Sequence, residues 1–258
     1  MVSLPAVVFA SGTAVPAITN APRLAAKPGT NGHGHGGGGG GGGTHFGWAS
    51  SNWSGYALSG SAGSYSSITG QWTVPTVTPT KGSTYSSSWI GIDGFNNSSL
   101  IQTGTEQDYT SGKAQYYAWW EILPAAETVI TGDTVKPGDT MTASITQVTS
   151  SSTWTITLSD KTQGWTFKTE QSYSGPAASA EWIEEAPTIG GHVATLANYG
   201  LTTFDPGTVN GGNPNLKTQD GGVMIQHLTQ VSTPSVPDAE ADGFAIQYGS
   251  TSPPAPTT

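Results

Sequence analysis

The chain has 258 residues, a length that suits one large domain or two small ones. Only 10% of the residues are charged, and 17 acidic against 8 basic side chains give a formal net charge of −9. This balance argues against a nucleic-acid-binding protein, which needs basic side chains to meet phosphates. The absence of cysteine excludes disulfides, thiol catalysis and cysteine-ligated zinc.

The first 46 residues do not resemble a packed domain. Residues 1–17 hold a short apolar stretch followed by small residues, which is the pattern of a secretory signal without its basic start. A run of eight glycines begins at Gly36 and predicts a flexible linker. We therefore expect a secreted protein with a folded domain over residues 47–249 and a disordered tail over residues 250–258. No apolar run approaches the ~20 residues of a membrane-spanning helix.

From Trp48 onward the sequence favours β-strands. Short segments rich in aromatic and β-branched residues alternate with turn signals, and no long apolar stripe of helical period occurs among them. Many short strands at close spacing predict an all-β fold, an antiparallel sandwich. The expected strands are 71–77, 86–92, 114–122, 140–148, 153–158, 164–169, 179–185, 192–199, 222–230 and 243–248.

Most common catalytic arrangements are missing from the sequence. It has no Gly-x-Ser-x-Gly elbow and no His-Glu-x-x-His zinc motif. The string closest to an aspartic protease site, Ile92-Asp93-Gly94, lacks the middle hydroxyl residue. Carboxylate chemistry remains, because a carboxylate on a half-buried strand has either a partner or a raised pKa. The candidates that stand among aromatic residues are Asp93, Glu121, Glu181, Glu184 and Glu185.

Strand alternation divides the glutamates of the segment 181–185. Glu181, Ile183 and Glu185 are expected on one face, and Trp182 and Glu184 on the other. A register shift of one residue would exchange the two faces and make Glu184 the inward residue. The pattern alone also allows all three glutamates to be solvated charges at a sheet edge.

A series of strings occurs in order over residues 48–248. Together they resemble the glutamic peptidases of the G1 family, also called eqolisins, although each string alone is weak. The strings are Ser51-Asn52-Trp53-Ser54-Gly55, Trp89-Ile90-Gly91-Ile92-Asp93-Gly94, Leu100-Ile101-Gln102-Thr103-Gly104, Tyr117-Ala118-Trp119-Trp120-Glu121 and Ala180-Glu181-Trp182-Ile183-Glu184-Glu185.

The resemblance implies a fold, a reaction and a site. The fold would be a sandwich of two antiparallel sheets of about seven strands each, like a concanavalin or jelly-roll domain. The reaction would be peptide-bond hydrolysis in acid by a secreted endopeptidase that pepstatin does not inhibit. Family members are commonly made with a propeptide, and the linker within residues 1–46 would be its remnant or its cleavage region. The catalytic dyad would be Gln102 and Glu185, and the residues lining or supporting the cleft would be Trp53, Asp93, Trp119 and Glu121.

Some features depart from the fungal members of that family. The loop between Asp93 and Gln102 is one residue shorter, Leu123 replaces an aromatic residue, and Glu184 stands where an aliphatic residue is usual. The missing cysteines leave acid stability to packing and strand pairing, and they suggest a bacterial source.

Two other classes of function remain open from the residues alone. An aromatic-rich acidic sandwich suits a carbohydrate-binding, lectin-like protein, and Glu121 with Glu185 could form the carboxylate pair of a glycoside hydrolase. Neither class needs the amide of Gln102. We expect a monomer that acts on polypeptides, with no cofactor or metal and with neither nucleic acid nor membrane as a partner.

Overall fold

The computed structural model describes residues 18–19, 45–149 and 151–257. The segment expected as a signal-like remnant and linker therefore lies outside the described residues, apart from residues 18–19 and 45–46. Among the described residues, no helix is long and apolar enough to cross a membrane.

The described chain is built almost entirely of strands. Its only helical element in these residues is a single 3-10 turn, η1 (Thr218–Asp220). The strands are β1 (Ile18–Thr19), β2 (Trp48–Ser50), β3 (Trp53–Ser59), β4 (Ser67–Thr73), β5 (Ser87–Ile92), β6 (Ile101–Thr110), β7 (Lys113–Ile122), β8 (Thr128–Val129), β9 (Thr140–Gln147), β10 (Thr153–Asp160), β11 (Trp165–Ser172), β12 (Ser179–Glu185), β13 (Thr188–Ile189), β14 (His192–Val193), β15 (Leu201–Val209), β16 (Gly221–Gln226), β17 (Thr229–Pro234) and β18 (Phe244–Tyr248).

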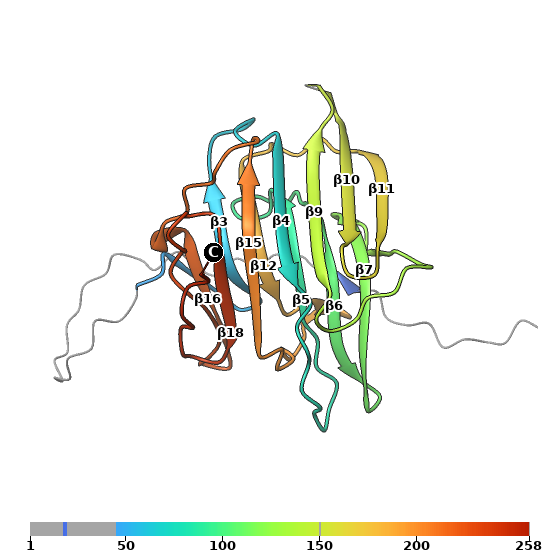
Figure 1. The fold of residues 1–258 in the computed structure, drawn as a ribbon, viewed down its shortest axis with the longest axis vertical. Coiled ribbons are helices and arrows are strands. Elements are labelled where there is room, and N and C mark those ends of the chain that lie inside the picture. The colour runs from blue at the N-terminus through green and yellow to red at the C-terminus, as the bar shows by residue number, and fades with distance from the viewer. Residues whose placement is uncertain (1–17, 20–44, 150, 258) are drawn as a thin grey trace, which may run out of the picture.

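The strands form two antiparallel layers. Hydrogen-bonded neighbours follow one path, β11-β10-β9-β4-β15-β18-β17-β16-β3-β12-β5-β6-β7-β8, and β2 pairs with β16 in parallel. The hairpin of β17 and β16 joins the first seven strands of this path to the last seven. In Figure 1 the layer with β15, β4, β9 and β10 lies in front of the layer with β12, β5, β6 and β7. The predicted all-β sandwich is confirmed.

Burial differs between the two layers. β9 and β10 of the front layer alternate buried and partly exposed residues, as expected where one face meets the core and the other meets water. Every residue of β5 and β12 in the second layer is buried, so both faces of that layer are covered. The inter-layer face packs large side chains such as Trp72, Trp154 and Trp182 into the main core.

Several predicted strands differ in extent from the observed ones. The segment 222–230 forms β16 and β17 instead of one strand, because His227 (φ 49°) and Leu228 (φ 65°) make a tight turn with positive φ at both central residues. β4 begins earlier than expected and ends before Pro75, and only His192–Val193 of the segment 192–199 is a strand. Among the longer strands, β3, β6 and β15 lie outside the expected segments.

The tail also differs from expectation. Residues 250–257 follow the domain: Ser252 Oγ donates a hydrogen bond to the Pro234 carbonyl at 2.8 Å, and Pro253 is buried. Proline loses little chain entropy on ordering, so a few contacts suffice to hold such a segment.

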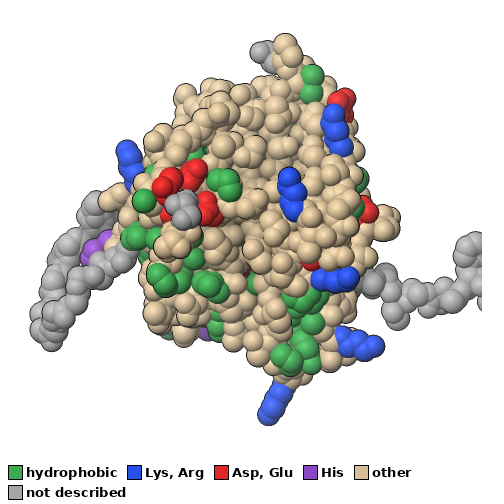
Figure 2. Space-filling view, viewed as in Figure 1, with side chains coloured by type: hydrophobic (Ala, Val, Ile, Leu, Met, Phe, Trp, Pro, Cys, Tyr) green, Lys and Arg blue, Asp and Glu red, His purple; other side chains and the backbone are tan. Residues whose placement is uncertain are grey.

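The surface carries few charged side chains on the face shown in Figure 2, in agreement with the 10% of charged residues in the sequence.

Candidate active site

One face of the second layer collects the predicted site residues. Glu185 of β12 lies opposite Trp53 of β3, and Gln102 of β6 lies opposite Glu121 of β7. Residues opposite each other in an antiparallel pair point to the same side of the sheet. Trp119 stands two residues before Glu121 on β7 and shares its side. Five side chains from four strands thus share one face, which we call the site face.

The Glu185 carboxylate is fully buried on this face and is held by two donors. Asn52 Nδ2 donates to Oε1 at 2.9 Å, and Trp89 Nε1 donates to Oε2 at 2.9 Å. Burial raises the pKa of Glu185 well above its ordinary value, the nearby Glu121 raises it further, and the N–H donors lower it. Burial and Glu121 therefore favour the protonated carboxyl group, and the N–H donors favour the carboxylate.

Gln102 and Glu121 form a buried pair. Gln102 Nε2 donates to Glu121 Oε2 at 2.5 Å, and neither side chain is exposed. The contact follows from strand register, because the two residues are direct partners in the pairing of β6 with β7. Glu121 links the two members of the predicted dyad, since it orients the Gln102 amide and its charge acts on Glu185.

A second glutamate of β12 stands on the site face. Glu181 lies opposite Gly91 of β5, which in turn lies opposite Gln102, so the glutamate and the glutamine share a row across the sheet. Burial raises the pKa of Glu181 well above its ordinary value, the Ser179 hydroxyl lowers it, and the charge of Asp93 raises it. Glu181 is thus the alternative base that an experiment must separate from Glu185.

Tryptophans form the apolar part of the site face. Trp53 and Trp89 meet edge to face with ring centroids 4.9 Å apart. Both belong, with Trp119 and Ile183, to a hydrophobic cluster that is separate from the main core. Trp53 and Trp119, which were expected to line or support a cleft, are both buried in this cluster.

Asp93, which was expected to line or support the cleft, is buried and enclosed by hydrogen-bond donors. Its buried carboxylate accepts hydrogen bonds from the Ala177 and Ala178 amides, at 2.7 and 2.8 Å, from the Tyr173 hydroxyl at 2.6 Å and from Asn97 Nδ2 at 3.0 Å. The donors from Tyr173, Ala177 and Ala178 tie the end of β5 to the loop that leads into β12, and Asn97 holds Asp93 from the loop after β5. The geometry points to a positioning role at the end of the site face.

Glu184 lies on the opposite face of β12. Its Oε2 accepts a hydrogen bond from Ser88 Oγ at 2.6 Å, and Trp182 on the same face belongs to the main core. Burial raises the pKa of Glu184 to about 8. The alternation expected for residues 181–185 is confirmed, and the register is the one that turns Glu185 toward the site face.

Three further residues lie at the site, and the sequence alone indicated no role for them. Asn52 and Trp89 occur inside the strings that carry the family resemblance, which was the available signal. Glu106 lies opposite Ser87 on the site face, and burial together with the charge of Asp108 raises its pKa well above the ordinary value. It belongs to β6, whose many polar residues concealed the strand.

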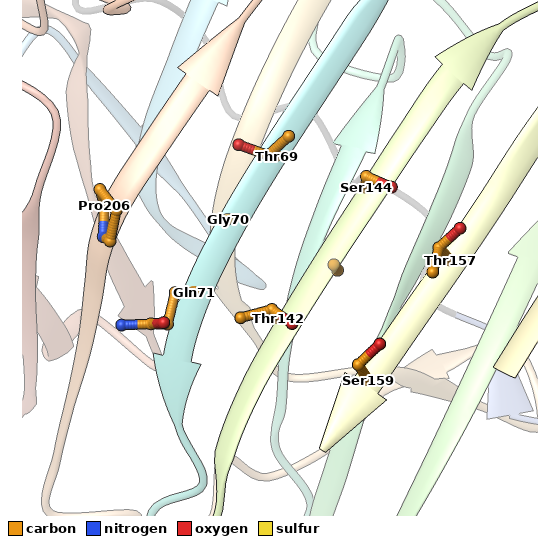
Figure 3. Close-up of a pocket in the computed structure, with 9 residues that line it drawn as sticks. Thr69, Gly70, Gln71, Thr142, Ser144, Thr157, Ser159 and Pro206 are labelled. Carbon is orange, nitrogen blue, oxygen red and sulfur yellow. The ribbon is translucent and has the colours of Figure 1, made fainter. Parts of the chain in front are cut away.

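One surface hollow lies on the front layer, away from this site. It occupies about 280 Å³ on the front layer, where the side chains in Figure 3 rise from β4, β9, β10 and β15. Its lining is Thr69, Gly70, Gln71, Thr142, Ala143, Ser144, Thr157, Ser159 and Pro206. No aromatic ring lines this hollow, so it lacks the stacking surface that the carbohydrate-binding hypothesis required.

Comparisons with known proteins converge on one family. The model of the Peptidase A4 family matches residues 51–247. Aspergillopepsin-2 of Aspergillus niger is 28% identical over an alignment of 201 residues that covers 68% of this chain and 70% of that protein. Scytalidopepsin B of Scytalidium lignicola is 31% identical over 140 residues, covering 52% of this chain and 51% of that protein.

Solved structures show the same fold. Scytalido-glutamic peptidase with a transition state analog inhibitor aligns with a TM-score of 0.66 over 77% of this chain and 98% of that one, at 24% identity. Aspergilloglutamic peptidase from Aspergillus niger aligns with a TM-score of 0.53 over 64% of this chain and 99% of that one, at 27% identity.

Proposed function

This chain belongs to the peptidase A4 family of glutamic endopeptidases, and we propose that it is a secreted acid endopeptidase whose catalytic dyad is Glu185 and Gln102. One observation carries the assignment of the dyad. The Glu185 carboxylate is buried between the N–H donors of Asn52 and Trp89, and its charged neighbour Glu121 holds the Gln102 amide.

In the proposed reaction, Glu185 first acts as a base. Its carboxylate takes a proton from water while the water oxygen attacks the carbonyl carbon of the peptide bond. The carbonyl oxygen becomes an oxyanion, which accepts a hydrogen bond from the Gln102 amide. The protonated Glu185 then gives its proton to the amide nitrogen as the carbon–nitrogen bond breaks. The products are a carboxylic acid and an amine, and Glu185 returns to its starting state.

Gln102 suits this role because its amide does not titrate in acid. The amide nitrogen carries two hydrogens, and Glu121 accepts one of them. This contact fixes the plane of the amide, so the other hydrogen has a defined direction for the developing oxyanion. A donor that is oriented before the reaction costs no reorganisation in the transition state.

Opposing contributions set the pKa of Glu185. A group that alternates between base and acid is most effective when its pKa lies near the working pH. Burial and Glu121 raise the pKa of Glu185, whereas the N–H donors to its two oxygens lower it and so favour the ionised form.

The substrate would be an extended polypeptide. The described residues Ile18–Thr19 already pair as a strand with Thr188–Ile189, which begins three residues after Glu185. An extended chain can therefore add to this edge by backbone hydrogen bonds. Trp53 and Trp119 would contact apolar side chains of the peptide, and Asp93 would hold the neighbouring loop. We further propose a monomer that needs no cofactor.

Three isosteric or truncating variants test the dyad. Glu185→Gln keeps the shape of the side chain but removes the base, and Gln102→Ala removes the oxyanion donor. We expect Glu185→Gln to abolish cleavage of casein in acid, and Gln102→Ala to lower kcat by about 10²–10³-fold. Glu181→Gln serves as the matched control and should keep most of the activity, with folding checked by circular dichroism for each variant.

The outcomes separate the two glutamates. Loss of activity in Glu181→Gln together with an active Glu185→Gln would assign the base to Glu181. Full activity in both Glu185→Gln and Gln102→Ala would refute the dyad. Inhibition of the wild-type protein by pepstatin would point to an aspartic site instead.

A further inference from the structure

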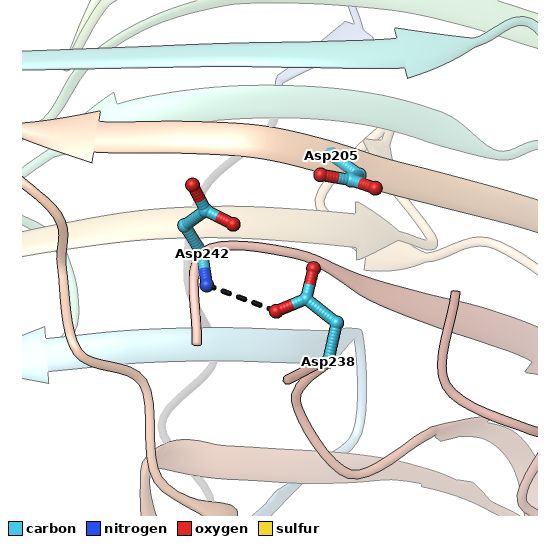
Figure 4. Close-up of side chains that lie close together, drawn as sticks. All are labelled: Asp205, Asp238 and Asp242. Atoms are coloured by element: carbon cyan, nitrogen blue, oxygen red, sulfur yellow. Dashed lines mark hydrogen bonds between the residues drawn. The ribbon is translucent and has the colours of Figure 1, made fainter. Parts of the chain in front are cut away.

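Three aspartates meet far from the site face. Asp205 comes from β15, and Asp238 and Asp242 come from the loop between β17 and β18. Figure 4 shows their carboxyl groups around a common space. One oxygen from each carboxyl group can be chosen so that all three lie within 4.8 Å of one another. Ca–O bonds are about 2.3–2.6 Å long, so two oxygens on opposite sides of a calcium ion lie about 4.6–5.2 Å apart. The spacing of the three aspartate oxygens is therefore compatible with one shared ion.

Asp238 is the buried member of this cluster and has an oxygen without a hydrogen-bond partner. Its side chain is only 8% exposed. Oδ1 accepts a hydrogen bond from the Asp242 amide at 3.2 Å, whereas Oδ2 has no partner among the described residues. A buried carboxylate oxygen without a donor is costly, so it calls for a ligand that the protein itself does not supply.

The backbone brings the aspartates together closely. The Gly207 amide donates to the Asp242 carbonyl at 2.8 Å, which ties β15 to the loop. At Gly243 a Cβ atom would lie 2.5 Å from Asp238 Oδ2 and 2.7 Å from Asp205 Cγ. Glycine at this position therefore allows the carboxyl group of Asp205 on β15 and that of Asp238 in the loop to approach each other.

The loop sequence has the spacing of a calcium loop. Acidic residues stand at positions 1, 3 and 5 of Asp238-Ala239-Glu240-Ala241-Asp242-Gly243, and glycine stands at position 6. This is similar to the first half of the EF-hand pattern, in which alternate residues turn oxygen ligands toward one ion, except that glutamate replaces the Asp or Asn of position 3. The glutamate that closes an EF-hand at position 12 is Gly249 here. Asp205 of β15 supplies the carboxylate that the loop itself lacks.

The charges around the cluster all have one sign. The charged neighbours that act on Asp205 are Asp238, Asp242 and Glu240, and those that act on Asp242 are Asp238 and Glu240. Four carboxylates held together repel one another unless protons or a cation neutralise them. Figure 2 shows acidic side chains gathered at one place on the face viewed, with basic side chains lying singly elsewhere.

We propose that Asp205, Asp238 and Asp242, with Glu240 beside them, bind one calcium ion. Carboxylate oxygens are the ligands that calcium prefers, and its flexible geometry accepts a site completed by carbonyl oxygens and water. The ion would join β15 to the loop between β17 and β18. It would stabilise the domain at pH values where the aspartates are ionised, and it takes no part in peptide hydrolysis.

Calorimetric titration of the full chain with calcium chloride tests the site. The protein is first stripped with a chelator and kept in potassium chloride near pH 7. We expect one ion per chain with a Kd below about 1 mM, and a rise in Tm with added calcium. Asp238→Asn and Asp205→Asn should each weaken binding at least tenfold and remove the rise in Tm. Asp133→Asn removes a carboxylate from a separate loop and should change neither quantity.

Three results would overturn the proposal. The first is no heat and no change in Tm up to about 5 mM calcium, a concentration at which even weak extracellular sites fill. The second is unchanged binding in folded Asp238→Asn and Asp205→Asn, since that would place the ion elsewhere. The third is an equal effect of magnesium chloride, because it would show general neutralisation of acidic charge instead of a calcium site.

Discussion

At the residue scale, the protonation of Glu185 depends on Trp89. The indole N–H donates to the buried carboxylate at 2.9 Å and favours its ionised form. Trp89→Phe keeps the ring and removes the donor, so the pKa of Glu185 should rise. A hydrogen bond to a charged group contributes about 1.5–3 kcal/mol, which corresponds to about one to two pH units. The acid limb of the pH profile of kcat/KM should move to higher pH by that amount.

Trp119→Phe is the matched control for this prediction. The Trp119 indole nitrogen is buried on the same face without a hydrogen-bond partner among the described residues. The substitution should therefore leave the acid limb in place, even if it alters KM. Equal shifts in both variants would mean that ring packing, not the hydrogen bond, controls the limb.

Residue roles were predictable only where a local rule applied. The alternation of side chains along a strand separated Glu185 from Glu184, and the structure agrees. The donor Asn52 is 133 residues away from Glu185 in the sequence. No local pattern reports such a contact, because it depends on which strands become neighbours. The aspartate cluster is a similar case. The spacing of the acidic residues in the loop 238–243 can be seen in the sequence, whereas the position of Asp205 beside that loop depends on the fold.

At the element scale, apolar patterning identified strands that lie against the core and missed β6. This strand carries Gln102, Glu106, Gln107 and Asp108, and all four are buried. Its polar side chains make the contacts of the site and of the interior, so hydrophobicity gives no signal there. The β16–β17 hairpin was read as one strand because its turn residues, His227 and Leu228, are not typical turn formers at positive φ.

The pairing of β1 with β13 leads to a prediction about residues 1–46. Ile18–Thr19 occupies the backbone edge of Thr188–Ile189, close to Glu185 along the chain. A peptide substrate that adds to the same edge must displace this segment. A chain that starts at residue 47 should therefore cleave a peptide substrate with a higher kcat/KM than the full chain, by several-fold or more.

A point substitution controls for the loss of so many residues. Ile18→Pro in the full chain removes a backbone donor and disfavours strand pairing. It should raise kcat/KM toward the value of the shortened chain, whereas Leu4→Pro, outside the pair, should not. Equal kcat/KM for the full and shortened chains would show that β1 does not compete with substrate.

At the scale of the whole molecule, the few charges are placed unusually. Besides Glu121, four glutamates are completely buried in the second layer, and burial raises the pKa of each of these four. They are Glu106, Glu181, Glu184 and Glu185. Apart from Glu185, which must ionise to act as the proposed base, these carboxyl groups suit a pH at which they carry protons. The scarcity of lysine and arginine acts in the same direction, since the acidified protein gains little net positive charge.

The domain should accordingly be most stable in acid. A carboxyl group with a raised folded pKa binds its proton more tightly in the folded state than in the unfolded state. Its contribution is fully present below the unfolded pKa of about 4.3 and is lost as the pH rises through the folded pKa, by up to about 1.4 kcal/mol per pH unit for each group. For Glu184 this stability is lost progressively up to its folded pKa of about 8.

Thermal melts in a chelating buffer should show Tm falling between about pH 4.5 and 8. Glu184→Gln should match the wild-type Tm in acid and exceed it near neutral pH, because the neutral amide keeps the volume without titrating. Glu170→Gln on the exposed edge of β11 should follow the wild-type curve at every pH. A wild-type Tm that rises from acid to neutral pH would contradict the assignment of these buried carboxyl groups as protonated.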